Sequence, residues 1–491
     1  MLDLIPWLDE TYIVEMGRLF LCGGDGDTTL LGRSATPLLP ICYVGPCLQE
    51  ISFRLFGVVG ARICPFVGLV AASAAFWLRL REEKSLPRIT GVLLSLLVLS
   101  SPLLFQSALL TRVDCWAVAF SLFALACLGD GSSERGNARL ASGAFFAVLS
   151  LFVWPTAAIL VPMYPAMCFS ASRAGLRELA RFVLYAIVAV AVLSMPLLAV
   201  GGVPLESFAR HYSEVTSSPS SLWDVVLPFA REIARSPFIA VLSCVGFVAW
   251  VRNRRFAAVA SFALALAACA KSGLYTFRIA YLAPFFFMQA LDAVRGWEVR
   301  CPRLVQAFLV AAVAYGFLTG PIGHFALDYP VLPNGLKEAL AKEVGVGPVR
   351  VFSPDHATYY VGRELGWKQL GFARPSDAED ETLLRGVLTN CEAVVLRDFD
   401  PYVPFQQSCT PYGLFCRYVL SRAKAESALP EGKKSWAGRF GSRFSFSWHG
   451  PLRLDGFDEV ARHEMIRVFR RSRRGEAGER IVTDEGSGSG E

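Results

Sequence analysis

Apolar runs separated by short polar connectors dominate the chain from residue 57 to residue 320. A helix that crosses the roughly 30 Å hydrocarbon core of a bilayer needs about 20 predominantly apolar residues. Several of these runs are shorter than that, but their regular succession predicts a bundle of membrane-spanning helices. We predict ten spans, at 57–78, 89–110, 114–128, 138–154, 156–171, 182–200, 237–251, 256–270, 279–294 and 304–320.

The segments on either side of this block have different patterns. Near the N-terminus, four apolar residues at helical spacing predict an amphipathic helix on the membrane surface. They are Ile13, Met16, Leu19 and Phe20. After residue 320, predicted helices at 332–344 and around Tyr359 alternate with strand-like stretches, PVRVFSP and CEAVVLRDF. This alternation predicts a small α/β domain.

The expected fold class is therefore an α-helical polytopic membrane protein with a C-terminal α/β domain. We divide the chain into four parts. They are an external loop with the amphipathic helix and an acidic pair (1–56), a transmembrane domain (57–320), the α/β domain (321–420) and a polar tail that we expect to be partly disordered (421–491).

The positive charges between the runs predict which side of the membrane each connector faces. If every run crosses the bilayer, five clusters of Arg and Lys fall on one side, at 79–88, 135–139, 173–181, 252–255 and 295–303. Cytoplasmic connectors carry such an excess of positive charge. The N-terminus, the 201–236 loop and the α/β domain then lie outside. Because no apolar helix precedes an N-terminus placed outside, we expect an eleventh helix upstream of Met1.

The composition agrees with a membrane protein and argues against several other classes of protein. The chain is 54% hydrophobic and 18% charged, with a mean hydropathy of +0.43, which argues against a soluble globular protein. The net charge of +6 balances 48 Lys and Arg against 42 Asp and Glu and indicates no large nucleic-acid surface. No P-loop or Rossmann fingerprint occurs, so chemistry with a nucleotide donor on the cytoplasmic side is unsupported.

Candidate chemistry gathers in the segments that we predict to lie outside. Asp9 and Glu10 form an acidic pair beside Trp7 and Tyr12. Carboxylates next to apolar membrane segments are costly unless they are used or paired. One interpretation is a catalytic base; the alternative is that the pair caps the following helix, since Asp and Glu favour helix N-termini.

Further charged residues are predicted on the same side. Arg112 and Asp114 interrupt the apolar sequence between two spans, where they either serve a substrate or simply pair with each other. The remaining candidates are Arg33, Arg210, His211, Glu214, Lys271, Tyr275 and Arg278. Cations at the interface suit a lipid-linked phosphate, and a carboxylate suits a base that activates a hydroxyl.

The order of several segments resembles the GT-C superfamily of integral membrane glycosyltransferases. These segments are WLDETYIVEMGRLF, TPLLPICY, RLFGVVGARICPFVGLVAA, TRVDCWAVAFSLFALA and YTFRIAYLAPFFF. The chain is most similar to the branch that contains protein O-mannosyltransferases and the lipid A aminoarabinose transferase. The resemblance covers residues 1–320 and rests on the order of the segments rather than on one motif.

The resemblance implies a mechanism. The first external loop of the superfamily supplies an acidic general base, and the sugar donor is a polyprenyl or dolichyl phosphate. Asp9 then corresponds to the catalytic aspartate, with Glu10 in support. Cations that hold the leaving phosphate correspond to Arg278, Lys271, Arg33 and Arg210, although the family often has a lysine where Arg33 stands. Some members also bind a divalent metal through a histidine, which His211 with Glu214 loosely resembles; no other cofactor is implied.

The predicted function is therefore transfer of a sugar from a polyprenyl-phosphate carrier to an acceptor hydroxyl on a glycan, lipid or protein. The acceptor would lie at the outer face of the plasma membrane. A lipid or sugar transporter, or flippase, is the alternative, but it requires charges along a path between both faces and the spans hold almost none in their middle. A membrane-anchored binding protein, in which the acidic pair only caps a helix, is a third interpretation.

Overall fold

The computed structural model describes most of the helical block and parts of the C-terminal region. The described residues are 8–22, 42–83, 85–129, 136–170, 172–199, 230, 234–271, 276–323, 332–353, 358–370, 386–397, 418, 421–422, 425–426, 429–437, 454, 456–464 and 466–472.

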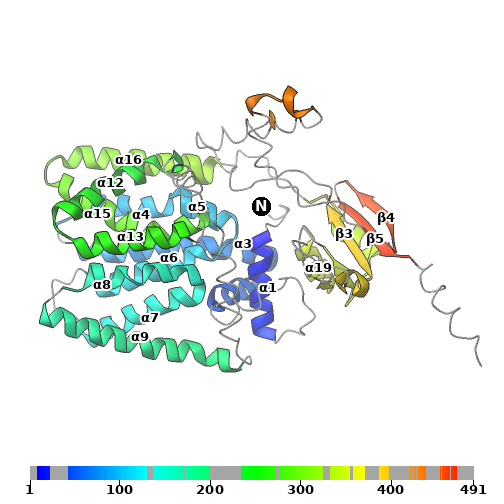
Figure 1. The fold of residues 1–491 in the computed structure, drawn as a ribbon, viewed down its shortest axis with the longest axis horizontal. Helices are drawn as coiled ribbons and strands as arrows, with labels where there is room; N and C mark the ends of the chain where they lie inside the picture. The colour runs from blue at the N-terminus through cyan, green and yellow to red at the C-terminus, as the bar shows by residue number, and fades with distance from the viewer. Residues whose placement is uncertain are drawn as a thin grey trace, which may run out of the picture.

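A bundle of roughly parallel helices makes up the larger part of the molecule (Figure 1). Its longer helices are α3 (Val44–Arg81), α4 (Arg88–Leu99), α5 (Pro102–Leu109), α6 (Asp114–Leu128), α7 (Asn137–Val153), α9 (Arg173–Ala199), α12 (Pro237–Arg252), α13 (Phe256–Lys271), α15 (Ala283–Glu298) and α16 (Pro302–Phe317). Short turns of helix complete it: η2 (Pro155–Leu160), α8 (Met163–Cys168), α14 (Thr276–Ile279), η3 (Ala280–Leu282) and η4 (Leu318–Ile322).

The helices follow the predicted apolar runs, but two of the runs contain a break, one at a proline and one at a glycine. The run at 89–110 is two helices, α4 and α5, bent by 40° just before Pro102, because proline disfavours helical backbone in the residue before it. The run that we expected to begin at residue 57 starts earlier, at Val44, and α3 is broken at Gly57, whose φ is 62°. Glycine adopts this left-handed conformation without steric cost.

Within the described residues, three helices are long and apolar enough to cross a membrane: α3, α9 and α16 with its extension to Ile322. The bent pair α4 and α5 would be a fourth if it forms one span. Shorter apolar helices include α6, α7, α12 and α13. The count of ten or eleven spans therefore stays a prediction.

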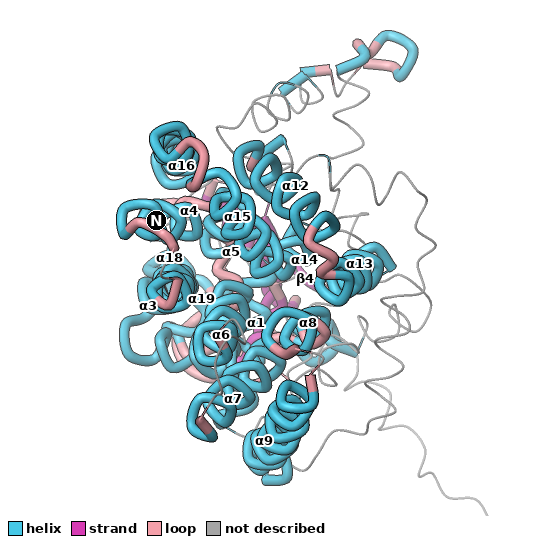
Figure 2. Tube along the Cα trace, turned by 90° about the vertical axis from the view of Figure 1, so that its left-hand side faces the viewer, coloured by secondary structure: helices cyan, strands magenta, loops and turns pink. Residues whose placement is uncertain are grey.

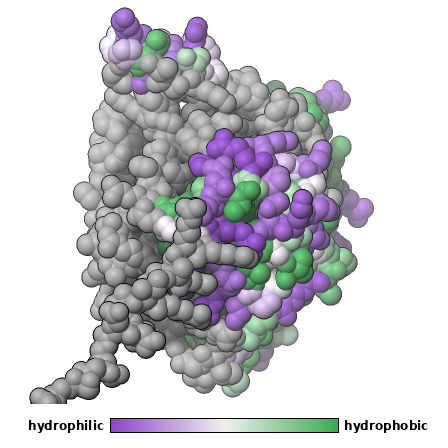
Figure 3. Space-filling view, turned by 90° about the vertical axis from the view of Figure 1, so that its right-hand side faces the viewer, coloured by the Kyte–Doolittle hydropathy of each residue, from purple (hydrophilic) through white to green (hydrophobic). Residues whose placement is uncertain are grey.

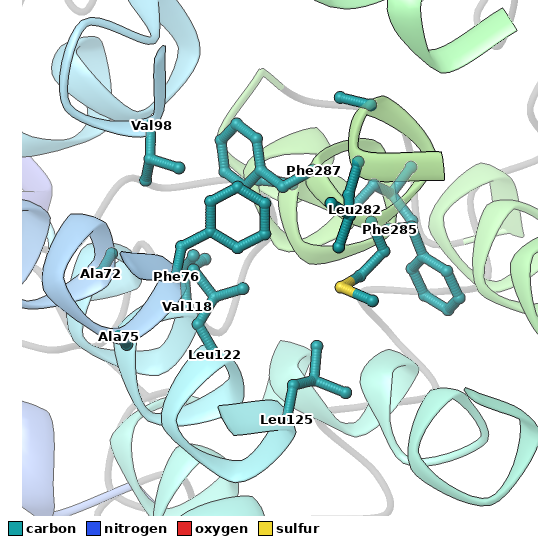
Figure 4. Packing of buried hydrophobic residues seen from close by; sticks show 14 of the residues in the cluster. Ala72, Ala75, Phe76, Val98, Val118, Leu122, Leu125, Leu282, Phe285 and Phe287 are labelled. Carbon is teal, nitrogen blue, oxygen red and sulfur yellow. The ribbon is translucent and has the colours of Figure 1, made fainter. Parts of the chain in front are cut away.

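Large apolar side chains fill the centre of the bundle (Figure 4). Phe76 of α3 meets Phe287 of α15 with ring centroids 5.7 Å apart, while Val118 and Leu122 of α6 are fully buried beside them. Looking along the helices, α6 and α15 lie inside the bundle and α9 and α16 lie at its edge (Figure 2). The exposed face of α9 is apolar, with Leu184 and Ile187 among its exposed residues, as suits a surface in contact with lipid.

The predicted amphipathic helix exists as α1 (Leu8–Cys22), but its surroundings differ from the prediction. It runs across one end of the bundle, between the bundle and the sheet (Figure 1). Its apolar residues Ile13 and Met16 are buried, and so are the polar Glu10 and Glu15. Gly17 permits this packing, because a Cβ there would lie 2.1 Å from the Pro46 carbonyl oxygen of α3. The helix is therefore enclosed by protein on both its apolar and its polar side.

The C-terminal region forms a five-stranded sheet with the strand order β2-β1-β3-β5-β4. Strands β1 (Arg350–Phe352), β2 (Lys368–Leu370) and β3 (Ala393–Arg397) are parallel, whereas β5 (Ile466–Arg471) and β4 (Phe457–His463) continue antiparallel. Helices α18 (Leu336–Glu343) and α19 (Tyr359–Leu365) precede β1 and β2. Seen from the side on which the sheet lies, the described residues at the surface of the molecule are largely hydrophilic (Figure 3).

The sheet extends past the boundary that we predicted at residue 420. Strand β5 pairs with β3 from Ile466 opposite Arg397 to Arg470 opposite Ala393, so residues 457–471 belong to the α/β domain and not to a tail. Ile466 and Val468 of β5 are buried in its core. Arg467, between them, belongs to the other face of the strand, which also carries the buried Phe469. The end of the predicted tail, residues 473–491, lies outside the described residues.

Candidate functional site

Three of the segments singled out from sequence meet at the end of the bundle that α1 crosses. Ile13 of α1, Val113 before α6 and Tyr281 of η3 pack in one buried cluster. The acidic pair precedes Ile13, Asp114 follows Val113, and Arg278 lies three residues before Tyr281. The tertiary structure therefore brings the acidic helix, the Arg112–Asp114 turn and the Arg278 segment to one site.

Glu10 is held by two partners and lies almost entirely inside the protein. Arg62 Nε of α3 donates to Glu10 Oε1 at 2.8 Å, and the Tyr360 hydroxyl of α19 donates to the same oxygen at 2.8 Å. The Glu10 residue is 3% exposed. Burial, and then the Glu10 carboxylate, hold the pKa of Tyr360 well above its usual value, so the phenol stays a donor. Glu10 is thus anchored to two other segments.

Asp9 belongs to the first turn of α1, next to Glu10; its side chain lies outside what the structure describes.

Arg112 and Asp114 pair with each other, which is one of the two alternatives left open by the sequence. Arg112 Nε donates to Asp114 Oδ2 at 2.7 Å. The Ser107 hydroxyl donates to the same oxygen at 2.6 Å, and the Tyr281 hydroxyl donates to Oδ1 at 2.6 Å. Asp114 is completely buried, and buried carboxylates need such partners to offset their lost hydration. This network joins α5, α6 and η3 beneath α1.

The turn that carries this pair has an unusual backbone. Thr111 has a φ of 56° although it is not glycine, a conformation that costs on the order of 1–3 kcal/mol. Its carbonyl oxygen accepts a hydrogen bond of 2.8 Å from Gln49 Nε2 of α3. The guanidinium of Arg112 lies over the Trp154 ring, 5.8 Å from its centroid. Packing from three sides thus maintains a turn that the local sequence disfavours.

A cavity of about 380 Å³ lies between α5, α12, α13 and α15. Its walls are mainly apolar, with Phe247, Phe262 and Phe286 among the lining residues. Gln289 also lines the cavity, and its Nε2 is buried without a hydrogen-bond partner among the described residues. Ligand pockets in proteins typically measure about 300–1,000 Å³ and combine apolar walls with a few polar groups.

Two arginines stand directly before residues that line this cavity. Arg278 precedes Ile279 and is partly exposed; Arg235 precedes Ser236 and is only 1% exposed. Arg235 donates from Nη1 to Gln106 Oε1 of α5, the residue before the Ser107 that binds Asp114. Two arginines thus lie next to cavity-lining residues in the chain, and Arg235 is bonded to α5, the helix that also supplies Ser107 to Asp114.

The other predicted site residues lie outside the described part of the structure. These are Arg33, Arg210, His211, Glu214 and Tyr275, together with the side chain of Lys271, whose backbone ends α13. Among the residues that the structure describes, no three His, Cys, Asp or Glu side chains are grouped as a metal site would need.

Sequence reasoning missed Arg235 and the residues that surround the polar side of α1. Arg235 had a signal, because it lies two residues before Pro237 at the predicted outer end of a span. Tyr360 and Arg363 had none, since they were read only as part of a predicted helix in the α/β domain. Their importance comes from contacts with segments more than 300 residues away in the chain.

No protein-family model and no curated protein matches the chain. Two solved structures resemble it at 10% sequence identity. The oligosaccharyltransferase of Archaeoglobus fulgidus, tethered to an acceptor peptide, has a TM-score of 0.48 over 84% of this chain and 68% of its own. Apo ArnT from Cupriavidus metallidurans has a TM-score of 0.37 over 95% of this chain and 94% of its own.

Both structures are GT-C membrane glycosyltransferases, the superfamily that the sequence motifs resemble. Because both TM-scores lie below 0.5, the function is inferred below from the residues of this chain.

Proposed function

We propose that this protein transfers a sugar from a polyprenyl-phosphate carrier to an acceptor hydroxyl at the outer face of the plasma membrane. The observation that carries the proposal is the apolar cavity, two of whose lining residues, Ser236 and Ile279, directly follow Arg235 and Arg278 in the chain. A polyprenyl phosphate has a long apolar chain and an anionic head, which suit an apolar interior and nearby arginines respectively. Arginine is the side chain best suited to hold phosphate, since its guanidinium can donate two parallel hydrogen bonds.

In the proposed reaction, the carboxylate of Asp9 accepts the proton of the acceptor hydroxyl. The hydroxyl oxygen then attacks the anomeric carbon from the side opposite the phosphate. A new glycosidic C–O bond forms as the bond between the anomeric carbon and the phosphate oxygen breaks. The lipid phosphate leaves with the bonding electrons, its charge stabilised by Arg235 and Arg278, and the configuration of the anomeric carbon is inverted.

The contacts of the neighbouring carboxylates support Asp9 as the base. Glu10 is engaged by Arg62 and Tyr360, and Asp114 by Arg112, Ser107 and Tyr281. A general base must be able to reach the proton that it removes, and a fully bonded buried carboxylate is poorly suited to do so. The proposed mechanism requires no cofactor; a divalent metal at His211 and Glu214 stays a prediction from the sequence.

The full chain in lipid nanodiscs tests the proposal. It is incubated with polyprenyl-phosphate sugars and acceptor glycans, lipids or peptides, and release of the free lipid phosphate is followed. We expect release by the native protein, inversion at the anomeric carbon by NMR, and loss of at least about 100-fold in Asp9→Asn, as removal of a general base predicts. Asp458→Asn, at an exposed position on β4, is the matched control and should be unchanged.

Two results would overturn the proposal. Release that is the same in Asp9→Asn as in the native protein would exclude Asp9 as the base. No release with any donor, combined with movement of labelled polyprenyl phosphate between the leaflets of a vesicle, would favour the transporter. As a further check, Arg235→Gln and Arg278→Gln should each raise the KM for the donor more than the KM for the acceptor.

A further inference from the structure

Helix α19 of the α/β domain binds the polar side of α1 through consecutive residues. The Tyr360 hydroxyl donates to Glu10 at 2.8 Å, and the Tyr359 hydroxyl donates to Glu15 at 2.7 Å. Glu10 and Glu15 are five residues apart, which is about 7.5 Å along a helix. The two tyrosines therefore contact α1 at separate points along its axis, and Tyr360 contacts the end that carries Asp9.

The ring of Tyr360 is fixed by α3. It stacks on Phe53 with centroids 5.4 Å apart, and the Arg62 guanidinium lies over it at 5.8 Å. The same Arg62 donates to Glu10. Glu10, Arg62 and Tyr360 thus form a closed triangle of contacts among α1, α3 and α19, in which each side chain touches the other two.

Close packing within the α/β domain sets the position of α19 in turn. A Cβ at Gly362 would lie 2.8 Å from atoms of Trp367 and Gln369, next to and on β2. The Gln369 side chain donates from Nε2 to the Tyr359 carbonyl oxygen at 2.8 Å. The orientation of the tyrosines therefore follows from the folded sheet, and the sheet is coupled through them to α1.

We propose that Tyr360 is a positioning residue for the transfer reaction, which sets the first turn of α1, and with it Asp9, by donating to Glu10. This inference rests on the proposed function of Asp9. It assigns Glu10 the role of an anchor instead of a second base, and it makes the α/β domain part of the catalytic structure. A shift of about 1 Å in a reacting group can lower a rate by about 100-fold, so one lost contact at this turn is expected to be visible in kcat.

The test compares two adjacent tyrosines in the full chain. Tyr360→Phe removes the hydroxyl that binds Glu10 but keeps the ring. Tyr359→Phe, the matched control, removes the hydroxyl that binds Glu15, which keeps two hydrogen bonds of 2.9 Å from Arg18 Nε. We expect Tyr360→Phe to lower kcat by about 10- to 100-fold with the donor KM unchanged, and Tyr359→Phe to change kcat by less than about two-fold.

Two further readouts separate positioning from loss of folding. The combination of Tyr360→Phe with Glu10→Gln should be no slower than the slower single variant, because both changes break the same contact. The acid limb of the pH–rate profile should be the same in Tyr360→Phe as in the native protein, since the base is unchanged. Equal losses of kcat in the two tyrosine variants, or additive losses in the combination, would refute the positioning role.

Hydrogen exchange distinguishes failure of this inference from failure of the proposed function. If the native protein transfers sugar and Tyr360→Phe is as fast, the inference is wrong and the proposed function stands. If the native protein is inactive with every donor, the proposed function falls and so does the catalytic role of Tyr360. The contact itself is then still tested: amides of residues 10–16 should exchange faster in Tyr360→Phe than in Tyr359→Phe, and equal exchange would contradict the anchoring of Glu10.

Discussion

The pairing of Arg363 with the buried Glu50 predicts that α19 depends on one partly buried cation. Arg363 Nη2 and Nη1 donate to the two oxygens of Glu50 at 2.9 and 3.2 Å, and the guanidinium lies 4.7 Å from the Phe53 ring centroid. Glu50 is completely buried in α3. Replacing Arg363 by Met keeps much of the apolar stem but leaves the buried Glu50 with less charge compensation.

The size of the effect follows from this burial. Removing one partner of a buried ion pair typically costs about 3–5 kcal/mol. Glu50 retains Arg54, whose Nε lies 2.8 Å from its Oε1, so we expect the lower end, about 3 kcal/mol. Since about 1.36 kcal/mol corresponds to a factor of ten, opening of α19 should become about 100-fold more frequent.

Hydrogen exchange of the α19 amides measures this opening directly. Lys337→Met is the matched control, because Lys337 also pairs with a glutamate, Glu364, at 2.6 Å, but both side chains are more than 40% exposed. Exposed pairs contribute little, so exchange in this variant should change by at most about five-fold. Adding Glu50→Gln to Arg363→Met should restore most of the protection, because no buried carboxylate is then left undercompensated and Arg54 is exposed to solvent.

The reasoning would be refuted if Arg363→Met exchanged no faster than Lys337→Met. It would also fail if Glu50→Gln gave no recovery, since the cost would then come from lost packing and not from an uncompensated carboxylate.

Two further predictions concern pH and the cavity. Burial raises the pKa of Tyr359 and Tyr360 well above the ordinary value of about 10, so the stability that they contribute is complete below pH 10 and is lost as the pH rises toward the raised values. The difference in melting temperature between the native protein and a variant with both tyrosines changed to Phe should therefore shrink from pH 9 to pH 11; a constant difference would contradict this. Ala240→Phe fills part of the cavity and should raise the KM for long-chain polyprenyl donors but not for short-chain ones, whereas Ala257→Phe, on an exposed face of α13, should raise neither.

Much of the helical block could be predicted from the sequence because each helix satisfies its own backbone. The prediction of 114–128 matches α6 (Asp114–Leu128), and that of 237–251 matches α12 (Pro237–Arg252), where a charged residue or a proline marks the start of an apolar run. The predicted run at 156–171 instead became the short helices η2 and α8. Pro155 and Pro162 interrupt that stretch, and proline removes a backbone donor.

The sheet was less predictable, because strands need partners that are distant in the chain. Strand β3 was expected from its apolar residues, but β4 and β5 were not, since three of the six residues of β5 are arginines. Only the tertiary structure shows that Ile466 and Val468 enter one hydrophobic cluster and Phe469 another. A one-residue shift of register would exchange the two faces, and the local sequence does not contain that information.

The sequence by itself determined which segments are apolar helices, where their polar ends lie and which carboxylates and cations gather at those ends. These properties follow from the length and composition of each segment, since a backbone among apolar surroundings must satisfy its own hydrogen bonds. Only the tertiary structure decided which charge compensates which. Arg62 compensates the charge of Glu10, to which Tyr360 also donates, and Arg363 compensates that of Glu50. The electrostatic free energy of a buried carboxylate depends on distances of a few ångströms, here between segments that lie from 52 to 350 residues apart in the chain.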